Sequence, residues 1–375
     1  MIAVLREVLS HYDLPGEITE VTECVSGHIN DTYRVTLVGP DGQEKELIVQ
    51  RINNYVFKDP ALVMHNIQVI TEHVKAKQGD YDCDIISFFE NKDQANYTKV
   101  QDQYWRVCQY VPDSVTYDFV ENSQVLYSAG YAFGRFQAIL SDLPMDRLYE
   151  TIPDFHNTRQ RLEDFFAIAE LDPLGRAKEV QEEIAFFREQ YDLATRLCDL
   201  LEAGEVPLRV THNDTKYNNI LMHEQTLKPL CVIDLDTVMP GLAMHDFGDA
   251  IRFAANTAVE DERDLTKVSL NLEHYREFTR GFLGACQGFL TQGEIETMAL
   301  GAVTITIELA SRFLADHIDG DKYFKIHREN HNLDRARCQI KLAQDMLDKY
   351  DIMCRIVEEC VTGQAATLEA AATRE

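Results

Sequence analysis

The sequence is poor in positive charge. Its 375 residues include 36 Lys and Arg against 63 Asp and Glu, so the formal net charge is −27 at pH 7. Binding to nucleic acid requires clustered Lys and Arg that neutralise phosphates, and binding to an anionic membrane surface has the same requirement. The shortage of cations therefore argues against both kinds of partner.

Paired cysteines and long apolar runs are also missing. The nine cysteines contain no C-x-x-C pair, which argues against a disulfide framework or a zinc site and indicates reduced thiols. The uncharged stretch 297–307 is much shorter than the roughly 18 to 20 apolar residues of a membrane span. The opening residues, MIAVLREVLSHYDL, include Arg6 and Glu7 in an amphipathic pattern that favours a surface helix over a signal peptide. We therefore expect a cytoplasmic protein outside the membrane.

The length and the apolar content suit two lobes with separate cores. The runs 33–38 and 45–50 are rich in β-forming residues, and the intervening GPDGQE marks a hairpin. Residues 60–78 begin with a proline and carry apolar residues at helical spacing, which predicts a helix. Another strand is predicted over 103–111. The chain therefore begins with a small sheet.

From about Ser123 onward the pattern becomes helical, with one β-rich interruption at 208–237. The last residues are rich in Ala and Thr without an apolar face, so we expect a frayed tail over 361–375. We predict an N-terminal lobe over 1–110 and a helical lobe over 111–360. The predicted helices cover 123–140, 159–170, 176–203, 270–289, 293–318 and 332–360.

The β-rich interruption carries the chemistry. In HNDTKYNNIL, the residues His212, Asp214, Lys216 and Asn219 follow the spacing H-x-D-x-K-x-x-N between two short apolar strands. Such a loop can direct a carboxylate at an acceptor hydroxyl while an amide oxygen five residues later coordinates a metal, as phosphoryl transfer requires. The strand LCVIDLDT then ends at Asp234, and Mg²⁺ prefers such oxygen ligands together with water and phosphate. If the two strands pair, Asn219 and Asp234 meet at one metal.

A second aspartate competes for the metal. Asp246 begins the triplet Asp246-Phe247-Gly248, and in protein kinases an Asp-Phe-Gly triplet contains the aspartate that binds magnesium. Here the residues that follow place apolar side chains at helical intervals, which is typical of an amphipathic helix. We therefore predict that Asp246 is the N-cap of this helix and also braces the catalytic loop, while Asp234 binds the metal.

Three other residues allow two interpretations each. For His212, a structural role with its ring bonded to the backbone near Asp234 is favoured over the role of a base. Lys216 is either a surface lysine or, as we favour, a contact for the γ-phosphate, because it lies two residues after the carboxylate. Asp236 is either a second metal ligand or a loop cap.

The segments HNDTKYNNIL and VIDLDT resemble the aminoglycoside phosphotransferase and choline kinase superfamily, which has a two-lobed, protein-kinase-like fold. LRVTHNDTKYNNILM, IDLDTVMPGLAMHDFGDAIRF, TAVEDERDLTKV, SRFLADHIDGDKYF and HNLDRARCQIKLAQDM are similar to the N-acetylhexosamine 1-kinases, which phosphorylate the anomeric hydroxyl of GlcNAc or GalNAc. GHINDTY and WRVCQYV are similar as well. The resemblance implies an α+β fold, with a small antiparallel-sheet lobe and a larger helical lobe, and ATP and Mg²⁺ as cofactors.

The resemblance also implies residues that hold the nucleotide. The stretch SGHIND, with the single glycine Gly27, corresponds to the loop that covers the nucleotide. In the strand LIVQRIN, Gln50 or Arg51 replaces the family's phosphate-pairing lysine, so both are candidates for a contact with ATP. The implied catalytic residues are Asp214 and Lys216, and the implied Mg²⁺ ligands are Asn219 and Asp234.

The sugar-binding residues implied by the resemblance lie far apart in the chain. They are His28, Thr237, Arg312 and Tyr323. Arg312 has a simpler interpretation, because an arginine four residues before Asp316 on a helix normally forms a surface ion pair.

We therefore expect an ATP-dependent kinase that converts an N-acetylhexosamine to its 1-phosphate. One alternative is another small-molecule kinase of the superfamily, acting on an aminoglycoside, choline or homoserine. The other is an inactive nucleotide-binding scaffold, and the joint presence of Asp214, Asn219 and Asp234 argues against it. The sequence leaves open the choice between GlcNAc and GalNAc, and the oligomeric state.

Overall fold

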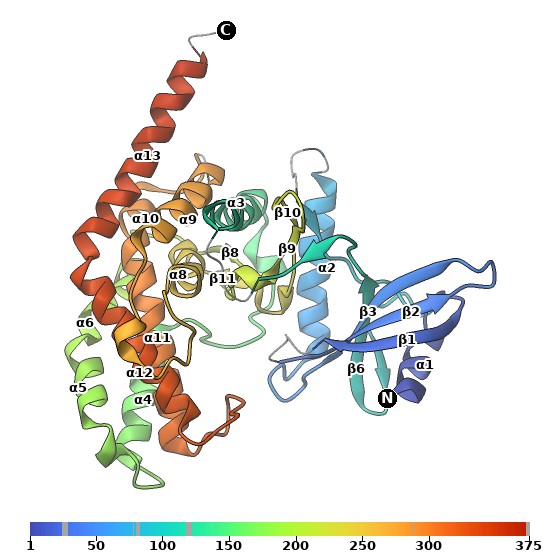
Figure 1. The fold of residues 1–375 in the computed structure, drawn as a ribbon, viewed down its shortest axis with the longest axis horizontal. Helices are drawn as coiled ribbons and strands as arrows, with labels where there is room; N and C mark the ends of the chain where they lie inside the picture. The colour runs from blue at the N-terminus through green and yellow to red at the C-terminus, as the bar shows by residue number, and fades with distance from the viewer. Residues whose placement is uncertain (25–28, 78, 80–82, 118–121, 287, 373–375) are drawn as a thin grey trace.

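The computed structural model describes residues 1–24, 29–77, 79, 83–117, 122–286 and 288–372, with 364–372 as backbone only. Two lobes lie side by side, with the N-terminal sheet at one end of the molecule and a group of helices at the other (Figure 1). The fold is the predicted α+β architecture, with a small antiparallel-sheet lobe and a larger helical lobe.

The N-terminal lobe is built on a five-stranded antiparallel sheet of order β1-β2-β3-β6-β5. Alternate side chains of β2 are buried, so that Tyr33, Val35 and Leu37 form an apolar face against α1. The predicted hairpin joins β2 and β3, and the strand predicted over 103–111 is β6. The elements are α1 (Ile2–Ser10), β1 (Glu17–Cys24), β2 (Asp31–Val38), β3 (Glu44–Ile52), β5 (Thr98–Val100) and β6 (Gln103–Gln109).

Helix α2 (Pro60–Ala76) lies between the sheet and the helical lobe (Figure 1). Asp59 caps it by accepting a hydrogen bond from the backbone N–H of Ala61 at 3.1 Å, and the proline occupies the first helical turn, where its missing N–H has no cost. The buried Asn66 donates its side-chain amide to the carbonyl oxygen of Val238 at 3.2 Å. This bond ties α2 to the segment that follows Asp234.

Two small sheets carry the β-rich segment 208–237. In the first, of order β4-β10-β9-β7, the hairpin of β9 and β10 places Ile220 opposite Val232. In the second, β8 and β11 pair with Thr211 opposite Met239. The loop after β8 and the turn after β10 are thereby brought together. The strands are β4 (Asp84–Ile85), β7 (Ser114–Val115), β8 (Arg209–Thr211), β9 (Ile220–His223), β10 (Pro229–Val232) and β11 (Met239–Gly241).

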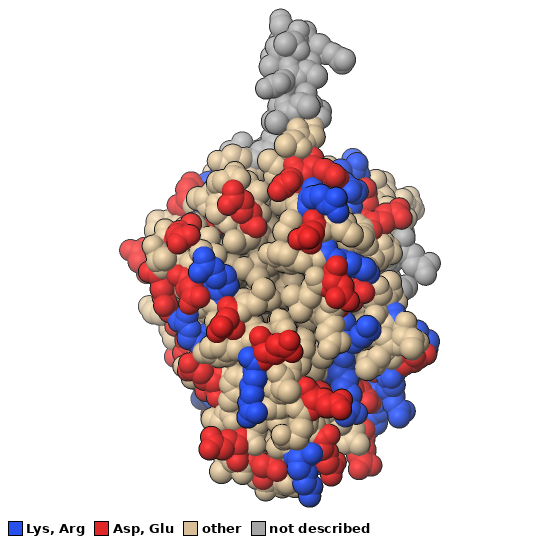
Figure 2. All heavy atoms as spheres, turned by 90° about the vertical axis from the view of Figure 1, so that its left-hand side faces the viewer, with Lys and Arg blue, Asp and Glu red and all other residues tan. Residues whose placement is uncertain are grey.

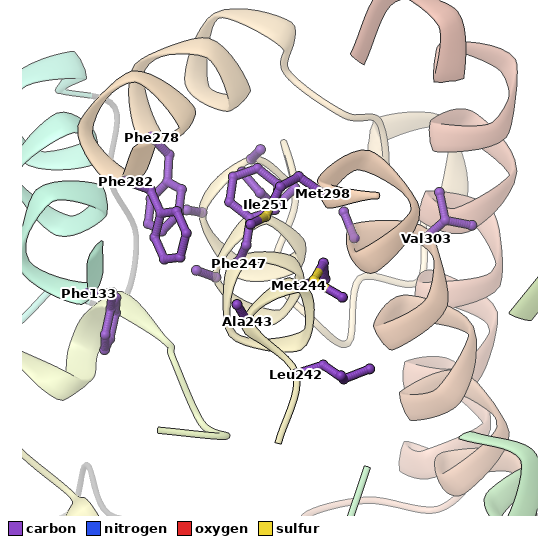
Figure 3. Close-up of a cluster of buried hydrophobic side chains, with 14 of the residues drawn as sticks. Phe133, Leu242, Ala243, Met244, Phe247, Ile251, Phe278, Phe282, Met298 and Val303 are labelled. Carbon is purple, nitrogen blue, oxygen red and sulfur yellow. The ribbon is translucent and has the colours of Figure 1, made fainter. Parts of the chain in front are cut away.

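The core of the helical lobe surrounds α8. Phe247 of α8 is fully buried against Phe278 and Phe282, with ring centroids 6.0 and 5.5 Å away (Figure 3). These aromatic contacts account for the phenylalanine of the Asp-Phe-Gly triplet. The main helices are α3 (Ser123–Ile139), α4 (Thr158–Leu171), α8 (Ala243–Ala254), α9 (Leu272–Ala285), α10 (Gln292–Glu296), α11 (Met298–Asp319), α12 (His331–Asp348) and α13 (Tyr350–Ala372).

Helices α8 and α11 approach each other closely at two glycines. A Cβ atom on Gly248 would lie 2.4 Å from the carbonyl oxygen of Gly301, and one on Gly301 would lie 2.3 Å from that of Met244. These separations are shorter than any van der Waals contact, so a larger residue would push the helices apart. The glycine of the triplet is therefore required by helix packing.

Several predicted helices are interrupted. The range 176–203 contains α5 (Gln181–Glu189), α6 (Tyr191–Ala194) and α7 (Arg196–Glu202), and α12 and α13 meet at Lys349. Apolar spacing continues across such short breaks, so periodicity alone does not detect them. Helix α13 continues to Ala372 through the region predicted as a frayed tail. Short 3-10 helices lie at Met145–Arg147, Ala177–Glu179, Tyr217–Asn219, Leu235–Thr237 and Leu265–Lys267.

Helix α11 is long and apolar enough to cross a bilayer by length and composition alone. However, 83% of its apolar window is buried inside the molecule, where it packs against α4, α8 and α12. We interpret it as the core helix of the lobe.

Acidic and basic side chains are mixed on the face shown in Figure 2. The described Lys and Arg residues on this face stand among Asp and Glu and do not gather into a large basic patch. This face has the electrostatic character of a mixed, solvated surface.

Candidate active site

The predicted catalytic loop follows β8 and ends in the 3-10 turn Tyr217–Asn219. Asn213, just before Asp214, has a left-handed backbone with φ of 65°, a conformation that Asn adopts more readily than most residues. Its side-chain amide donates to the carbonyl oxygen of Thr237 at 2.9 Å. The loop is thereby held in a tight bend that presents Asp214.

Asp246 holds the loop from behind. Its carboxylate accepts hydrogen bonds from the backbone N–H groups of His212 and Asn213 at 2.8 and 2.7 Å, and from the Gln137 amide at 2.8 Å. These bonds confirm the prediction that Asp246 braces the loop. The prediction that it is an N-cap is wrong, because α8 begins at Ala243 and Asp246 lies within its first turn. Burial raises the pKa of Asp246, and the nearby His212 and the donors only partly offset this effect.

Asp214 forms an ion pair with Lys216. Its Oδ1 lies 3.0 Å from the lysine Nζ, and Asn219 donates its amide to Oδ2 at 3.1 Å. Burial alone would raise the pKa of Asp214, but the charge of Lys216 outweighs burial and the pKa lies below its usual range. Burial alone would lower the pKa of Lys216, but Asp214 and then Asp249 outweigh it and raise the pKa. At neutral pH the site therefore holds a carboxylate beside an ammonium.

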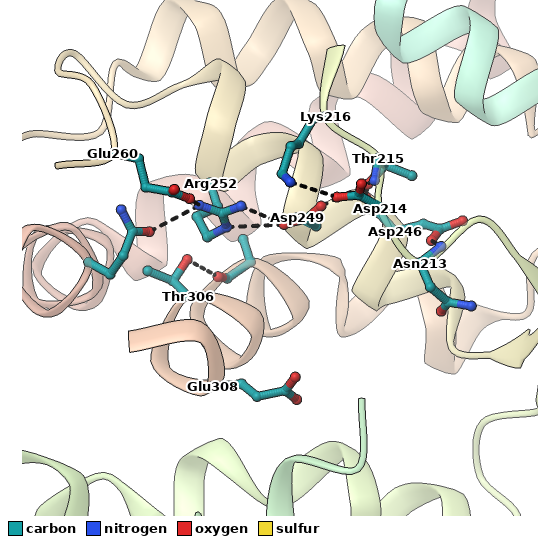
Figure 4. A network of polar contacts seen from close by, with 12 residues as sticks. Asn213, Asp214, Thr215, Lys216, Asp246, Asp249, Arg252, Glu260, Thr306 and Glu308 are labelled. Atoms are coloured by element: carbon teal, nitrogen blue, oxygen red, sulfur yellow. Dashed lines mark hydrogen bonds and ion pairs between the residues drawn. The ribbon is translucent and has the colours of Figure 1, made fainter. Parts of the chain in front are cut away.

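A chain of charges extends from the loop into α8 (Figure 4). The backbone N–H of Thr215 donates to Asp249 at 3.1 Å. Arg252 donates twice to Asp249, at 3.0 and 2.9 Å, and once to Glu260 at 2.8 Å, although only 1% of it is exposed. The sequence alone does not reveal this support, because an Asp and an Arg three residues apart on a helix usually form an exposed pair.

Strand pairing brings Asn219 and Asp234 together. The N–H of Ile233 donates to the carbonyl oxygen of Asn219 at 2.9 Å, which extends the β9–β10 hairpin by one bond. The ring Nε2 of His212 lies 2.9 Å from the carbonyl oxygen of Ile233. This contact confirms the predicted structural role of His212.

The surroundings of Asp234 suit a cation. Its side chain reaches solvent, yet the surrounding protein, followed by the carboxylates of Asp236 and Asp214, raises its pKa to about 7. Among the described residues, no hydrogen bond or ion pair involves the Asp234 carboxylate, and none involves the amide oxygen of Asn219. A divalent cation would relieve the repulsion between the carboxylates.

The residues present fit Mg²⁺ as well. This ion usually takes one or two protein ligands and completes its shell with phosphate oxygens and water. The described part of the chain has no cluster of three or more His, Cys, Asp or Glu that could hold a metal unaided. Asn219 and Asp234 thus offer the two oxygens that Mg²⁺ needs, and their assignment as its ligands stays a prediction.

Asp236 links the lobes, a role that neither predicted alternative included. Its carboxylate forms a buried ion pair with Arg106, in which Nη2 donates to Oδ2 at 3.1 Å, and it accepts a hydrogen bond from Asn30 at 2.7 Å. Arg106 lies on β6, only 1% exposed. The turn that contains Asp234 is therefore fastened to the N-terminal sheet.

Arg106 also lies close to the position on β3 where the family's phosphate-pairing lysine is replaced by Gln50 or Arg51. It lies opposite Gln50 in the sheet, and its Nε donates to the Gln50 side chain at 3.0 Å. Arg51, the next residue on β3, faces the other side and pairs with Asp31 at 2.6 Å. Arg106 thus places a cation one strand away from the position where the family carries its lysine. Nucleotide contacts of Gln50 and Arg51 stay predictions, and Gly27 lies outside the described residues.

The predicted sugar-binding residues separate into two groups. The buried Thr237 lies at the catalytic loop, where its hydroxyl donates to the carbonyl oxygen of His212 at 2.8 Å. Arg312 and the half-exposed Tyr323 meet at Phe324 instead. His28 lies outside the described residues. Their contacts with a sugar stay predictions.

Arg312 does not form the ordinary helix ion pair. Its guanidinium lies 5.3 Å from the ring centroid of Phe155 and 5.7 Å from that of Phe324. The Asp316 carboxylate accepts backbone hydrogen bonds instead, including one from Tyr323 at 2.8 Å, and no ion pair joins it to Arg312 in the part of the chain that the structure describes.

His156, which lies outside every sequence motif described above, also contacts the catalytic loop. Its Nε2 lies 3.0 Å from the carbonyl oxygen of Asn213, and its Nδ1 lies 2.8 Å from Oε1 of Glu308 on α11. The other Glu308 oxygen accepts a hydrogen bond from Thr158 at 2.6 Å. No sequence motif connects His156 with Glu308, which is 152 residues away.

The fold and the site together define a two-lobed, kinase-like phosphotransferase. The chain belongs to the phosphotransferase enzyme family (APH), whose family profile matches residues 20–278. It is therefore a small-molecule phosphotransferase of the aminoglycoside phosphotransferase and choline kinase superfamily.

Solved structures with the same fold include kinases with diverse acceptors. A microcompartment-associated aminopropanol kinase is 15% identical, with 97% of this chain and 98% of that chain covered and a TM-score of 0.58. An amicoumacin kinase in complex with AMP-PNP is 14% identical, with 92% and 93% covered and a TM-score of 0.59. An ethanolamine kinase from Plasmodium vivax is 13% identical, with 87% and 84% covered and a TM-score of 0.51.

Proposed function

We propose that this protein is an ATP-dependent, cytoplasmic kinase that phosphorylates the anomeric C1 hydroxyl of N-acetylhexosamines. The resemblance of the segments in residues 208–345 to N-acetylhexosamine 1-kinases supports the acceptor class. The pairing of Asp214 with Lys216 beside Asn219 and Asp234 supports the phosphoryl transfer.

The observation that carries the choice of acceptor is the pair of arginines at Phe155, whose neighbour His156 contacts the catalytic loop. Arg312 lies between two aromatic rings without an ion pair among the described residues. Arg161 lies close enough to Arg312 for the two charges to interact. Burial lowers the pKa of Arg161 first, and the charge of Arg312 lowers it further. The Arg161 Nε donates to the carbonyl oxygen of Phe155 at 3.2 Å, and the neighbouring His156 contacts the loop at Asn213.

Two guanidinium groups so close together repel a cationic acceptor. An aminoglycoside or an amino alcohol needs anionic side chains around its ammonium groups, and Glu308, a carboxylate close to both arginines, is already bonded to His156 and Thr158. A neutral sugar with hydroxyl and acetamido oxygens can accept hydrogen bonds from arginine. The cationic surroundings therefore favour a neutral acceptor over the amino alcohols and aminoglycosides.

The chemistry follows from the side chains in the loop. Asp214 orients the C1 hydroxyl and accepts its proton as the new oxygen–phosphorus bond forms and the bond to the leaving ADP breaks. Lys216 neutralises charge on the phosphoryl group in transfer. Mg²⁺, held by Asn219 and Asp234, would supply further neutralisation of the phosphate charges. A hemiacetal hydroxyl is more acidic than an ordinary alcohol, so a carboxylate base suffices.

A coupled assay of ADP release tests the proposal. The protein is incubated with MgATP and N-acetylglucosamine, N-acetylgalactosamine, their methyl glycosides, ethanolamine, choline, homoserine or an aminoglycoside. We expect turnover with the free N-acetylhexosamines only, and a phosphorus NMR signal coupled to the anomeric proton. A 6-phosphate, or equal activity on the methyl glycosides, would exclude the anomeric reaction. Turnover with the amino alcohols or aminoglycosides alone would assign the chain to that branch of the family.

A further inference from the structure

His156 stands at the junction of three elements. It precedes α4, its ring contacts the ring of His245 on α8 with centroids 5.5 Å apart, and it bonds to Glu308 on α11. Its other nitrogen reaches the carbonyl oxygen of Asn213. The ring is therefore the physical link between the core helix α11 and the residue immediately before Asp214.

Both partners of the His156 ring are hydrogen-bond acceptors. A backbone carbonyl oxygen has no proton to donate, and neither has an ionised carboxylate. A neutral imidazole carries one N–H and can satisfy only one of them, whereas an imidazolium satisfies both. The geometry is thus completed only when both ring nitrogens of His156 carry protons.

Glu308 is ionised in these surroundings. Burial alone would raise its pKa, but the charge and the hydrogen bond of His156, followed by the charge of Arg312, outweigh burial and lower the pKa to about 2. Thr158 donates to its second oxygen, which also favours the charged form. Glu308 therefore accepts from His156 and does not donate to it.

The charged groups around His156 act in opposite directions. Burial lowers its pKa, but the charge and hydrogen bond of Glu308 outweigh burial and the net shift is upward. Arg312 on α11 opposes the imidazolium. His245 does not compete for the proton, because burial, followed by the charge of His156, lowers its pKa to about 4. Arg161 on α4 interacts electrostatically with two members of this cluster, Arg312 and Glu308.

We propose that His156, as an imidazolium anchored by Glu308, holds the carbonyl group of Asn213 and thereby positions Asp214 for catalysis. Asp246 accepts a hydrogen bond from the backbone N–H of Asn213, the residue with the left-handed backbone. Asn213 is therefore held by hydrogen bonds at both its N–H and its carbonyl group. Loss of either hydrogen bond allows the backbone of Asn213 to leave its left-handed conformation, which moves the carboxylate of Asp214. The inference rests on the proposed kinase function, with Asp214 as the catalytic carboxylate.

The charge state is tested without any substrate. Imidazole nitrogen NMR of the ¹⁵N-histidine-labelled protein at pH 7.5, about one unit above the ordinary histidine pKa of about 6.5, reports the protons on each ring. The His156 signals are assigned by their absence in His156→Gln. We expect both His156 nitrogens to be protonated, and a neutral His156 at this pH would overturn the inference.

The positioning role is tested by kinetics with whichever acceptor the wild-type protein uses. His156→Gln keeps a donor for one partner only, and we expect kcat to fall about 10- to 100-fold while KM for ATP changes less than about threefold. Glu308→Gln keeps the shape but removes the anchoring charge, so the basic limb of the kcat profile should move about one unit toward lower pH. His65→Gln is the matched control, because His65 is exposed and also contacts a backbone carbonyl, that of Arg147, at 3.2 Å.

The outcomes separate this inference from the proposed function. An unchanged kcat in His156→Gln, or an unchanged pH profile in Glu308→Gln, would overturn the positioning role while leaving the kinase assignment intact. If the wild-type protein phosphorylates no acceptor, the proposed function fails, and the NMR experiment still decides the charge of His156. Circular dichroism and thermal unfolding identify a variant that fails to fold. If His156→Gln is that variant, His156→Asn replaces it both in the assignment of the NMR signals and in the kinetics.

Discussion

Two aspartates flank the catalytic loop, and their surroundings are opposite. Asp246 on α8 is 1% exposed and accepts three hydrogen bonds, two of them from the backbone of the loop. Asp234 reaches solvent and has no such bond among the described residues, while Asp236 and Asp214 lie close enough to raise its pKa. The first is a carboxylate whose acceptors are already used, and the second is one that a cation would complete.

The comparison shows why a three-letter match misleads. Each residue of the Asp-Phe-Gly triplet has a structural reason that involves no metal. Asp246 bonds to the loop, Phe247 fills the aromatic core, and Gly248 allows the close approach of α11. Residue type and spacing agree with the kinase motif, but the surrounding secondary structure is a packed helix rather than the end of a strand.

The largest effect on turnover should come from a change at Asp214, the predicted catalytic carboxylate of the loop between these two aspartates. Asp214→Asn keeps the size of the side chain but removes the proton acceptor, so we expect kcat to fall by about 10²- to 10⁴-fold. Binding of ATP, measured by calorimetry, should be nearly unchanged because the loop remains held by Asp246. Turnover within about tenfold of wild type would contradict the assignment.

Asp234→Asn should lower activity without lowering stability, in contrast to a change at Asp246. Removing this carboxylate should lower Mg²⁺-dependent turnover by about 10²- to 10³-fold, because charge stabilisation of the phosphoryl group weakens. Stability at pH 7 should hold or rise, because a repelled carboxylate disappears. A titration of turnover against Mg²⁺, with a thermal melt of the same variant, measures both. Asp102→Asn is the control, since its side chain is 92% exposed and far from the loop in sequence.

Asp246→Asn should show the opposite pattern, in which stability falls strongly and the response of turnover to Mg²⁺ is kept. The amide cannot accept all three hydrogen bonds, and a buried donor left unpaired costs about 1–3 kcal/mol, so we expect the free energy of unfolding to fall by about 2–4 kcal/mol. Turnover should fall less than in Asp214→Asn, and its dependence on Mg²⁺ should keep its midpoint. Urea unfolding and the same Mg²⁺ titration test this. If Asp246→Asn abolished the Mg²⁺ response and Asp234→Asn did not, the two roles would be reversed.

The smallest effect concerns the glycine of the triplet. Gly248→Ala would place a Cβ atom against the backbone of Gly301, and overpacking of this kind costs about 1–3 kcal/mol. Gly363→Ala is the matched helical control, because a Cβ atom there would meet nothing within 4 Å. It should be neutral or stabilise by about 0.5–1 kcal/mol. Equal stability of the two variants in urea would show that close helix packing is not the reason for Gly248.

The sequence by itself determined the local elements and the short-range geometry of the site. Runs of β-forming residues located β2, β3 and β6, and helical periodicity located α2, because both signals depend on the local backbone conformation. Asp214, Asn219 and Asp234 lie within a loop and a hairpin of adjacent strands, so their proximity follows from local chain geometry. For the same reason the bond between His212 and the backbone of Ile233 was predictable.

Only the tertiary structure decided which charges meet across the chain. Gln137 and Asp246 are 109 residues apart, Arg106 and Asp236 are 130, and His156 and Glu308 are 152. No local periodicity connects such pairs, because their contact depends on how the sheet, α3, α8 and α11 pack. Burial then changes the roles of these side chains, since a charge removed from water must find a partner wherever packing provides one. The sequence therefore specifies the catalytic loop, and packing specifies the groups that hold it in place.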